Sequence, residues 1–167
     1  MKPDIYIHRA KIEDASLLWE WANDADVRRF SFNKEPIEYS HHLEWLKNKL
    51  QSEAISFWLI ELKGVPVAQV RYEKVAPDMA EINFSVSANF RGQGIGALAL
   101  QETESLAGSE LDIFHLQAIV LKKNPASQRV FEKCGYTLKG QEIREGIVCF
   151  RYQKKLNGTT IGVELWK

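Results

Sequence analysis

Arg91-Gly92-Gln93-Gly94-Ile95-Gly96 is the stretch of the chain that decides the fold. It follows a strand-like run, residues 82–86, and precedes a helix-like run that extends from residue 95 to residue 107. Glycine has no Cβ, so three glycines in five positions let backbone N–H groups approach an anion closely. The positive dipole end of the following helix points at the same place. Strand, glycine turn and helix together predict a binding site for a phosphate group.

A second segment strengthens this interpretation. Residues 124–136 read Asn-Pro-Ala-Ser-Gln-Arg-Val-Phe-Glu-Lys-Cys-Gly-Tyr and lie one predicted strand further along the chain. The glycine turn alone is equally well interpreted as an ordinary strand-to-helix connection that binds nothing. The two segments together favour a ligand site.

Two other glycine-rich motifs do not fit the sequence. A P-loop has four residues between its glycines and then Gly-Lys-Ser/Thr, and no Lys-Ser or Lys-Thr follows Gly96. A dinucleotide fold places Gly-x-Gly-x-x-Gly after the first strand of a βαβ unit. Here the order is Gly-x-Gly-x-Gly, well into the chain.

With both segments in view, the chain resembles the GNAT superfamily of acyl-CoA-dependent N-acyltransferases. The first signature of that family, Arg/Gln-x-x-Gly-x-Gly/Ala, is matched by Arg91, Gly94 and Gly96. The second begins with an Asn at a helix start and ends with Gly-Phe or Gly-Tyr, and residues 124–136 match it. The resemblance covers roughly residues 5–156. It implies one acyltransferase domain over residues 1–156 and a separate tail over residues 157–167.

Composition agrees with a single globular domain and excludes several classes. A chain of 167 residues removes about 70% of its unfolded surface from water. The 22 basic and 22 acidic residues cancel, so we expect no nucleic-acid partner. No apolar run approaches the ~18 residues of a membrane span. Cys134 and Cys149 lack metal or redox spacing, so we expect no metal site and a reducing, cytoplasmic location.

Hydrophobic periodicity predicts the order of the elements. Strands are expected at residues 4–10, 55–62, 65–73, 80–87, 115–121, 136–142 and 147–154, and helices at residues 13–23, 26–30, 38–50, 95–107 and 124–134. This order predicts an α/β (α+β) fold, a mixed sheet with helices on both faces. The resemblance implies the GNAT fold: a mostly antiparallel sheet of about seven strands. Strands 80–87 and 115–121 would then splay apart and hold CoA.

The resemblance also implies acetyl-CoA as the co-substrate and assigns residues to it. The pyrophosphate would bind the glycine turn, the pantetheine arm would pair with the preceding strand, and the helix after residue 124 would complete the site. An N–H near Val86 would stabilise the oxyanion of the attacked thioester. The cofactor-binding residues expected are Phe84, Ser85, Val86, Arg91, Gly92, Gln93, Gly94, Ile95, Gly96, Asn124, Ser127 and Phe131.

Acyl transfer to an amine needs a base. An alkylamine has a pKa near 10.4, so less than about 1% of it is the free nucleophile at neutral pH. Glu81 is the candidate, because it begins the central strand where many family members carry a catalytic acidic residue. The alternative is a solvated carboxylate, or one paired with a cross-strand arginine such as Arg71.

The general acid is harder to assign. Many family members have a Tyr four residues before the Gly of the second motif, and that position is Phe131 here. A phenyl ring donates no proton, so Tyr136, Ser127, Cys134 or water would have to protonate the CoA thiolate. Since a thiol has a pKa of about 8.5, a dedicated acid is not essential. The alternative for Tyr136 is a core aromatic residue with a hydrogen-bonded hydroxyl.

The acceptor is expected to bind near the first helices. Residues 18–24 read Leu-x-Glu-Trp-x-Asn-Asp, residues 28–33 read Arg-x-Phe-Ser-Phe-Asn, and residues 42–46 read His-x-x-Trp-Leu. This pattern is similar to that of bacterial family members that acetylate nucleotide-linked 4-amino-6-deoxy sugars. The expected substrate-binding residues are Trp21, Asn23, Phe32, Asn33 and His41.

Other acceptors and roles stay open. A related subgroup acetylates the N-termini of ribosomal proteins, and other small amines are further candidates. Trp21 and Trp45 also fit a purely packing role. With Phe131 in place of Tyr, a non-catalytic CoA-binding domain is the competing class. The apolar tail, with Ile161, Val163, Leu165 and Trp166, is a candidate homodimer interface.

Overall fold

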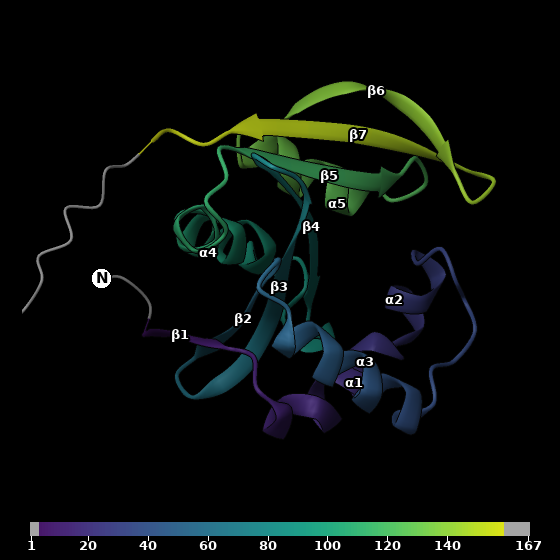
Figure 1. Ribbon diagram of the computed structural model, residues 1–167. Helices are drawn as coiled ribbons and strands as arrows, with labels where there is room; N and C mark the ends of the chain where they lie inside the picture. The colour runs from purple at the N-terminus through teal and green to yellow at the C-terminus, as the bar shows by residue number, and fades with distance from the viewer. Residues whose placement is uncertain (1–3, 159–167) are drawn as a thin grey trace, which may run out of the picture.

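The computed structural model describes residues 4–158 (Figure 1). Seven strands form one sheet in the order β1-β2-β3-β4-β5-β7-β6. Their bounds are β1 Ile5–Arg9, β2 Ile55–Leu62, β3 Val65–Ala76, β4 Met79–Val86, β5 His115–Leu121, β6 Thr137–Arg144 and β7 Ile147–Lys155. The expected mixed sheet of seven strands is confirmed. The interface predicted for the apolar tail lies outside the described residues.

The helices are placed close to their predicted positions. Their bounds are η1 Ile12–Asp14, α1 Ala15–Ala22, α2 Ala25–Arg29, α3 Tyr39–Gln51, η2 Ala88–Phe90, α4 Ile95–Leu111 and α5 Pro125–Lys133. The helix α4 runs four residues past the predicted end at residue 107, because Ala107 and Leu111 continue its buried face. Within residues 4–158, no helix is long and apolar enough to cross a membrane.

The parallel contact between β4 and β5 is short. Every other neighbouring pair of strands is antiparallel, whereas β4 and β5 pair in parallel from Met79↔His115 only as far as Glu81↔Gln117. Beyond Glu81 the two strands diverge, although β4 continues for five more residues and β5 for four. The prediction that these two strands splay apart is confirmed.

Helices cover the sheet on both faces, and two core clusters fill the layers. Successive strand residues alternate between faces. On one face, Val70 and Tyr72 of β3 belong to the main core cluster with residues of α4 and α5. On the other face, Phe57 of β2 packs with Leu18 of α1 and Leu46 of α3. Figure 1 shows α1, α2 and α3 gathered beside the N-terminal strands, with β5, β6 and β7 at the opposite end.

Candidate active site

A cavity of about 1010 Å³ opens where β4 and β5 separate. One part of its wall comes from the end of β4, the glycine turn and the helices α4 and α5. The other part comes from α1, α2, α3 and the central strands β2 and β3. We refer to these two parts as the cradle and the acceptor half. The cradle residues are Phe84, Val86, Arg91, Gly92, Gly94, Ile95, Gly96, Asn124, Ser127, Arg129, Val130 and Lys133.

The backbone of the glycine turn has the geometry that an anion needs. Gly92 and Gly94 have φ of +74° and +79°, a conformation that other residues adopt at a cost. Gly94 is the N-cap of α4, so the free N–H groups at the start of this 17-residue helix lie next to the glycine turn. A Cβ at Gly96 would lie 3.0 Å from Phe84 and 3.3 Å from Val130. Gly96 therefore lets α4 approach both β4 and α5.

The helix α5 adds positive charge beside this turn. Asn124 caps the helix by accepting the Ser127 N–H at 3.2 Å, and its amide donates to Ser127 Oγ at 3.1 Å. One turn apart on the cavity side, Arg129 and Lys133 have no ion-pair partner within residues 4–158. The Lys133 Nζ lies 4.0 Å from the position of a Cβ at Gly94. Free N–H groups and two unpaired cations suit a polyphosphate.

Arg91 is occupied differently. Its Nη2 is 2.8 Å from Asp24 Oδ1, its Nη1 is 3.2 Å from Asp26 Oδ2, and its Nε donates to the Val86 carbonyl at 3.1 Å. Burial raises the pKa of Asp24, but hydrogen bonds from Arg91 and from two backbone amides outweigh this and leave the pKa lowered. The guanidinium thus fastens α2 to the end of β4, and its charge is largely matched by two carboxylates.

A row of polar side chains forms the floor of the acceptor half. Gln69 of β3 donates from Nε2 to Asn83 Oδ1 at 3.1 Å and to Ser85 Oγ at 3.2 Å, both on β4. The Gln69 Oε1 is buried and has no hydrogen-bond partner among the described residues. Asn83 and Ser85 lie beyond the last β4–β5 pair, and they line the cavity together with Gln69.

Arg71 continues the row on β3. Its guanidinium carbon lies 4.9 Å from the ring centre of Trp45 and 5.7 Å from that of Phe57. Its Nε donates to Glu73 Oε1 at 2.6 Å, and Lys49 holds the other oxygen of that carboxylate at 3.0 Å. Burial lowers the pKa of Arg71, and Glu73 opposes this. The guanidinium is therefore fixed in place at the cavity wall.

The family profile for the acetyltransferase (GNAT) domain matches residues 4–137, most of the chain. The chain belongs to the GNAT acetyltransferase family. Among curated relatives, the spermidine N(1)-acetyltransferase of Escherichia coli K12 is 22% identical over 147 residues, 86% of this chain and 78% of that protein. The L-2,4-diaminobutyric acid acetyltransferase of Streptomyces coelicolor is 26% identical over 132 residues, 77% of this chain and 72% of that protein.

Solved structures agree on the fold. A ribosomal L7/L12 alpha-N-protein acetyltransferase in complex with coenzyme A superposes with a TM-score of 0.81 at 16% identity, covering 95% of this chain and 97% of that one. GNAT enzymes are acetyl-CoA-dependent N-acetyltransferases that act on amines. The predicted family, fold class and enzyme class are confirmed, whereas the nucleotide-sugar subgroup is not established by these relatives.

Most residues expected to hold the GNAT co-substrate lie together. Ten of the twelve line the cavity, and Gln93 and Phe131 do not. Gln93 donates to the Asn89 carbonyl at 3.1 Å. Phe131 is buried in the main core, where it contacts Phe84 edge-on at 5.5 Å between ring centres. Phe131 therefore supports the cradle from behind through Phe84.

Glu81, the predicted base, is held by an arginine. Arg144 Nη1 lies 2.8 Å from Glu81 Oε1, and Gln117 donates to Oε2 at 3.1 Å. Glu81 lies on the same face of β4 as Asn83 but outside the cavity lining. Arg71 is not its partner, because the register places Glu73 opposite Glu81 and Arg71 pairs with Glu73. The catalytic role of Glu81 stays a prediction.

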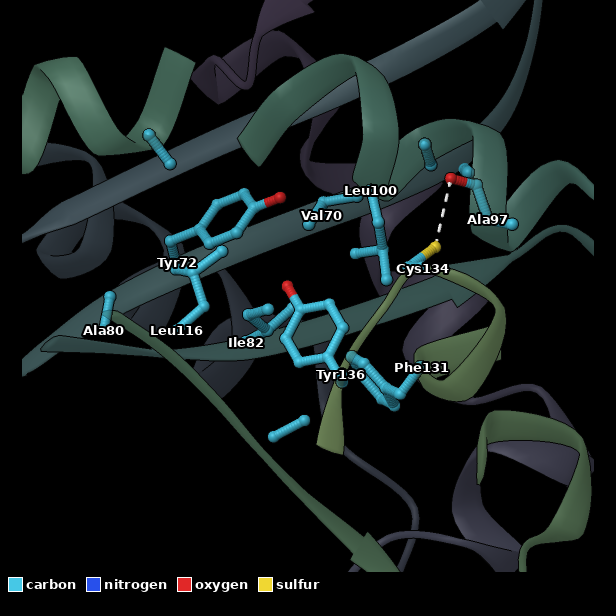
Figure 2. Close-up of a cluster of buried hydrophobic side chains, with 14 of the residues drawn as sticks. Val70, Tyr72, Ala80, Ile82, Ala97, Leu100, Leu116, Phe131, Cys134 and Tyr136 are labelled. Carbon is cyan, nitrogen blue, oxygen red and sulfur yellow. Dashed lines mark hydrogen bonds between the residues drawn. The ribbon is translucent and has the colours of Figure 1, made fainter. Parts of the chain in front are cut away.

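Tyr136 lies in the core (Figure 2). Its hydroxyl donates to Glu104 Oε1 at 2.7 Å, and Lys154 holds Glu104 Oε2 at 2.6 Å. Burial, and then the Glu104 carboxylate, raise the pKa of Tyr136 well above its usual value. The ring also contacts Phe131 and does not line the cavity. This position matches the alternative interpretation of a core aromatic residue, and its role as an acid stays a prediction.

Of the five predicted acceptor residues, His41 lines the cavity. Asn23 instead holds the loop after α2, since its side chain both donates to the Ile37 carbonyl at 2.9 Å and accepts the Ile37 N–H at 2.8 Å. Asn33 caps a turn by accepting the Glu35 N–H at 2.9 Å. Trp21 packs against the smaller core cluster. Neither Trp21 nor Phe32 lines the cavity.

Sequence reasoning missed several residues of the acceptor half, notably Gln69, Arg71 and Asn83. All three belong to polar rows at every second position of two central strands. That alternation was visible in the sequence, but it is typical of strands with one face in the core, so it did not mark these positions as functional. His42 is 4% exposed, its Nε2 has no partner among the described residues, and burial lowers its pKa. Its imidazole is therefore neutral at pH 7.

Proposed function

We propose that the chain acetylates the amino group of a nucleotide-linked 4-amino-6-deoxy sugar, using acetyl-CoA. The cradle fits the co-substrate, because two left-handed glycines and the free N–H groups of α4 face Arg129 and Lys133 across one cavity. The coenzyme A complex of the ribosomal-protein acetyltransferase supports the same assignment. The acceptor half of the cavity indicates which amine would be acetylated.

The charge of the cavity wall carries the acceptor proposal. Among the described residues that line the acceptor half, Arg28, Arg29 and Arg71 are cationic, and the one carboxylate, Asp26, is already paired with Arg29 and Arg91. The other lining cations, Arg91, Arg129 and Lys133, belong to the cradle. A polycation such as spermidine would meet like charges in a partly desolvated site, which costs free energy. An amine attached to an anionic or neutral body avoids this cost.

A nucleotide-linked amino sugar meets these conditions. Its diphosphate complements the cationic wall, and its base and sugar rings suit the aromatic side chains Trp45, Phe57 and Phe30 that line the acceptor half. A volume of about 1010 Å³ is at the upper end of the range of ligand cavities. The diaminobutyric acid acetyltransferase among the relatives also acts on an amine that carries an anionic group.

Direct transfer is the chemistry that the cavity supports. The free amine attacks the thioester carbonyl, a C–N bond forms, the C–S bond breaks, and the proton lost by the amine balances the proton that CoA gains. The unpaired edge of β4 near Ser85 and Val86 is the place for backbone N–H groups to stabilise the developing oxyanion. Glu81 is the proposed base, reached through water from the Asn83 end of the polar row.

A panel of amines tests this proposal. Thermal shift with acetyl-CoA is measured first, and thiol release is then followed with a UDP-linked 4-amino-6-deoxy sugar, 2,4-diaminobutyrate, spermidine and a short N-terminal peptide. We expect a thermal shift, thiol release with the sugar nucleotide, and a kcat/KM for spermidine at least 100-fold lower.

Each other outcome selects a different function. Comparable turnover of spermidine would overturn the charge argument. Turnover of the peptide alone would make the chain a protein N-terminal acetyltransferase. A thermal shift without thiol release from any amine would leave a non-catalytic CoA-binding domain.

A further inference from the structure

Arg71 has an arrangement that its packing role does not explain. Its Nε is fixed by Glu73, and its guanidinium carbon lies over the rings of Trp45 and Phe57. The side chain is only 16% exposed. Yet neither Nη1 nor Nη2 forms a hydrogen bond with any residue in the described part of the chain. Four N–H donors therefore end at the cavity wall without a protein acceptor.

The surrounding charges leave the group cationic. Within residues 4–158, Glu73 is the one carboxylate in contact with Arg71, and it is shared with Lys49. Two cations against one carboxylate leave a surplus of one positive charge. Both oxygens of Glu73 are occupied, by Arg71 Nε and by Lys49 Nζ. Glu73 thus holds the guanidinium in position without satisfying its terminal donors.

The location points to the acceptor and not to the co-substrate. In the sheet register Arg71 lies opposite Asn83, and its neighbour in the polar row, Gln69, lies opposite Ser85. Asn83 and Ser85 line the cavity, on the part of β4 that lies beyond the last β4–β5 pair. Arg71 thus lies two residues along β3 from Gln69, which is opposite Ser85, near which the amine must attack. It is on the α3 side of the cavity, away from the glycine turn.

We infer that the Arg71 guanidinium binds an anionic group of the acceptor, a carboxylate or a phosphate, through its two terminal nitrogens. It thereby positions the amine at the thioester. A planar guanidinium with two free terminal nitrogens matches both anions bidentately. The contact with Trp45 reduces the conformational entropy lost on binding, because the guanidinium is already oriented. This inference rests on the proposed amine acetylation and deepens it by assigning the acceptor an anion.

The test compares Arg71→Met and Arg71→Lys with Arg9→Met. Arg9, on β1 and outside the cavity, is a matched control. Its guanidinium carbon lies 5.0 Å from the ring centre of Trp58, and its guanidinium pairs with Glu110. The carboxylate arm measures kcat/KM for 2,4-diaminobutyrate relative to 1,3-diaminopropane, which has the same two amines and no carboxylate. The phosphate arm measures UDP binding by calorimetry with saturating CoA, which blocks the cradle.

We expect Arg71→Met to weaken one arm by about 10–100-fold, the range of a charged hydrogen bond, with Arg71→Lys intermediate and Arg9→Met unchanged. Loss in the first arm identifies a carboxylate and loss in the second a phosphate. Unchanged values in both arms, at wild-type CoA affinity and Tm, would overturn the inference, as would a wild-type protein with no preference in either arm.

The two proposals fail separately. If no amine is acetylated, the proposed function fails, and UDP binding still decides whether Arg71 holds an anion. If Arg71→Met does not fold, Arg71→Lys decides the question. This substitution retains the positive charge beside Glu73 and removes only the paired terminal nitrogens of the guanidinium.

Discussion

The Nη2 atom of Arg91 lies 2.8 Å from the Asp24 Oδ1, so the first residue of the glycine turn is bonded to the residue that caps α2. This pair ties the acceptor half to the cradle. The same Asp24 oxygen accepts the backbone N–H groups of Asp26 and Val27. One carboxylate therefore sets both the start of α2 and the position of Arg91.

Asp24→Asn keeps the cap and removes the charge. Because the folded pKa of Asp24 is lowered, its stabilisation is present above the unfolded pKa near 3.9 and is lost as the pH falls through the folded pKa. We expect a loss of about 0.5–1 kcal/mol at pH 7 that disappears once the pH lies below the folded pKa of Asp24. Urea unfolding of both proteins across this range measures it. A constant difference at all pH values would contradict the assignment to charge.

Gly94→Ala separates backbone strain from ligand binding. Gly64, in the β2–β3 turn, is a matched control, since it has φ of +76° against +79° and nothing within 4 Å of an added Cβ. Both substitutions should cost about 1 kcal/mol of stability. Only Gly94→Ala should weaken acetyl-CoA binding, by at least 10-fold, since its Cβ obstructs the approach to the N–H groups of α4. Equal acetyl-CoA affinity of the two variants, by calorimetry, would remove the phosphate from this turn.

Lys133→Gln tests the charge beside the cradle. We expect the Kd for acetyl-CoA to rise about 5–10-fold at low salt, with a smaller effect at 0.5 M salt, where screening is strong. Lys139→Gln on β6 is the control, because Lys139 is exposed and outside the cavity. An equal effect of both substitutions would mean that only net charge matters.

Glu81→Gln and Glu142→Gln distinguish a base from an ion-pair partner. Arg144 contacts both carboxylates, at 2.8 Å and 3.3 Å. If Glu81 is the base, Glu81→Gln should lower kcat at least 10-fold at acidic and neutral pH and leave acetyl-CoA affinity unchanged. Glu142→Gln should keep the wild-type pH profile. Matching profiles for the two variants would move the base elsewhere, with the neutral imidazole of His42 the next group to substitute.

Tyr136→Phe removes the hydroxyl bonded to Glu104 at 2.7 Å. A buried carboxylate then loses one of its two partners, which should cost about 1–2 kcal/mol and lower Tm by about 3–6 °C in a chain of this size. If Tyr136 is only a core residue, kcat should change less than 3-fold, because the hydroxyl points into the core. A kcat loss of 100-fold or more, with Tm unchanged, would instead support the acid role.

Local patterns were enough to predict what depends on neighbouring residues. The glycine turn, the helix start at Asn124 and the consecutive strands at residues 55–62 and 65–73 all occur close to where they were predicted. The splayed pair followed from the family resemblance.

Contacts between distant residues could not be predicted in this way. The Arg71–Trp45 contact depends on how α3 lies over β2 and β3. The Glu81–Arg144 pair joins strands that are not neighbours in the sheet. His42 and His41 differ by one position, yet one is buried and the other exposed, because adjacent helical residues point in different directions.

The short β4–β5 contact makes the stability of the folded protein depend on its ligand. The edge of β4 after Glu81 has no strand beside it, so an extended amide chain lying there acts as an additional strand of the sheet. Folding and acetyl-CoA binding are then one coupled equilibrium, and ligand at 100 times its Kd adds about 2.7 kcal/mol to the free energy of unfolding. Amide hydrogen exchange at residues 83–86 should slow when the ligand is added. The lifetime of the folded chain would thus follow the acyl-CoA concentration of the cell that contains it.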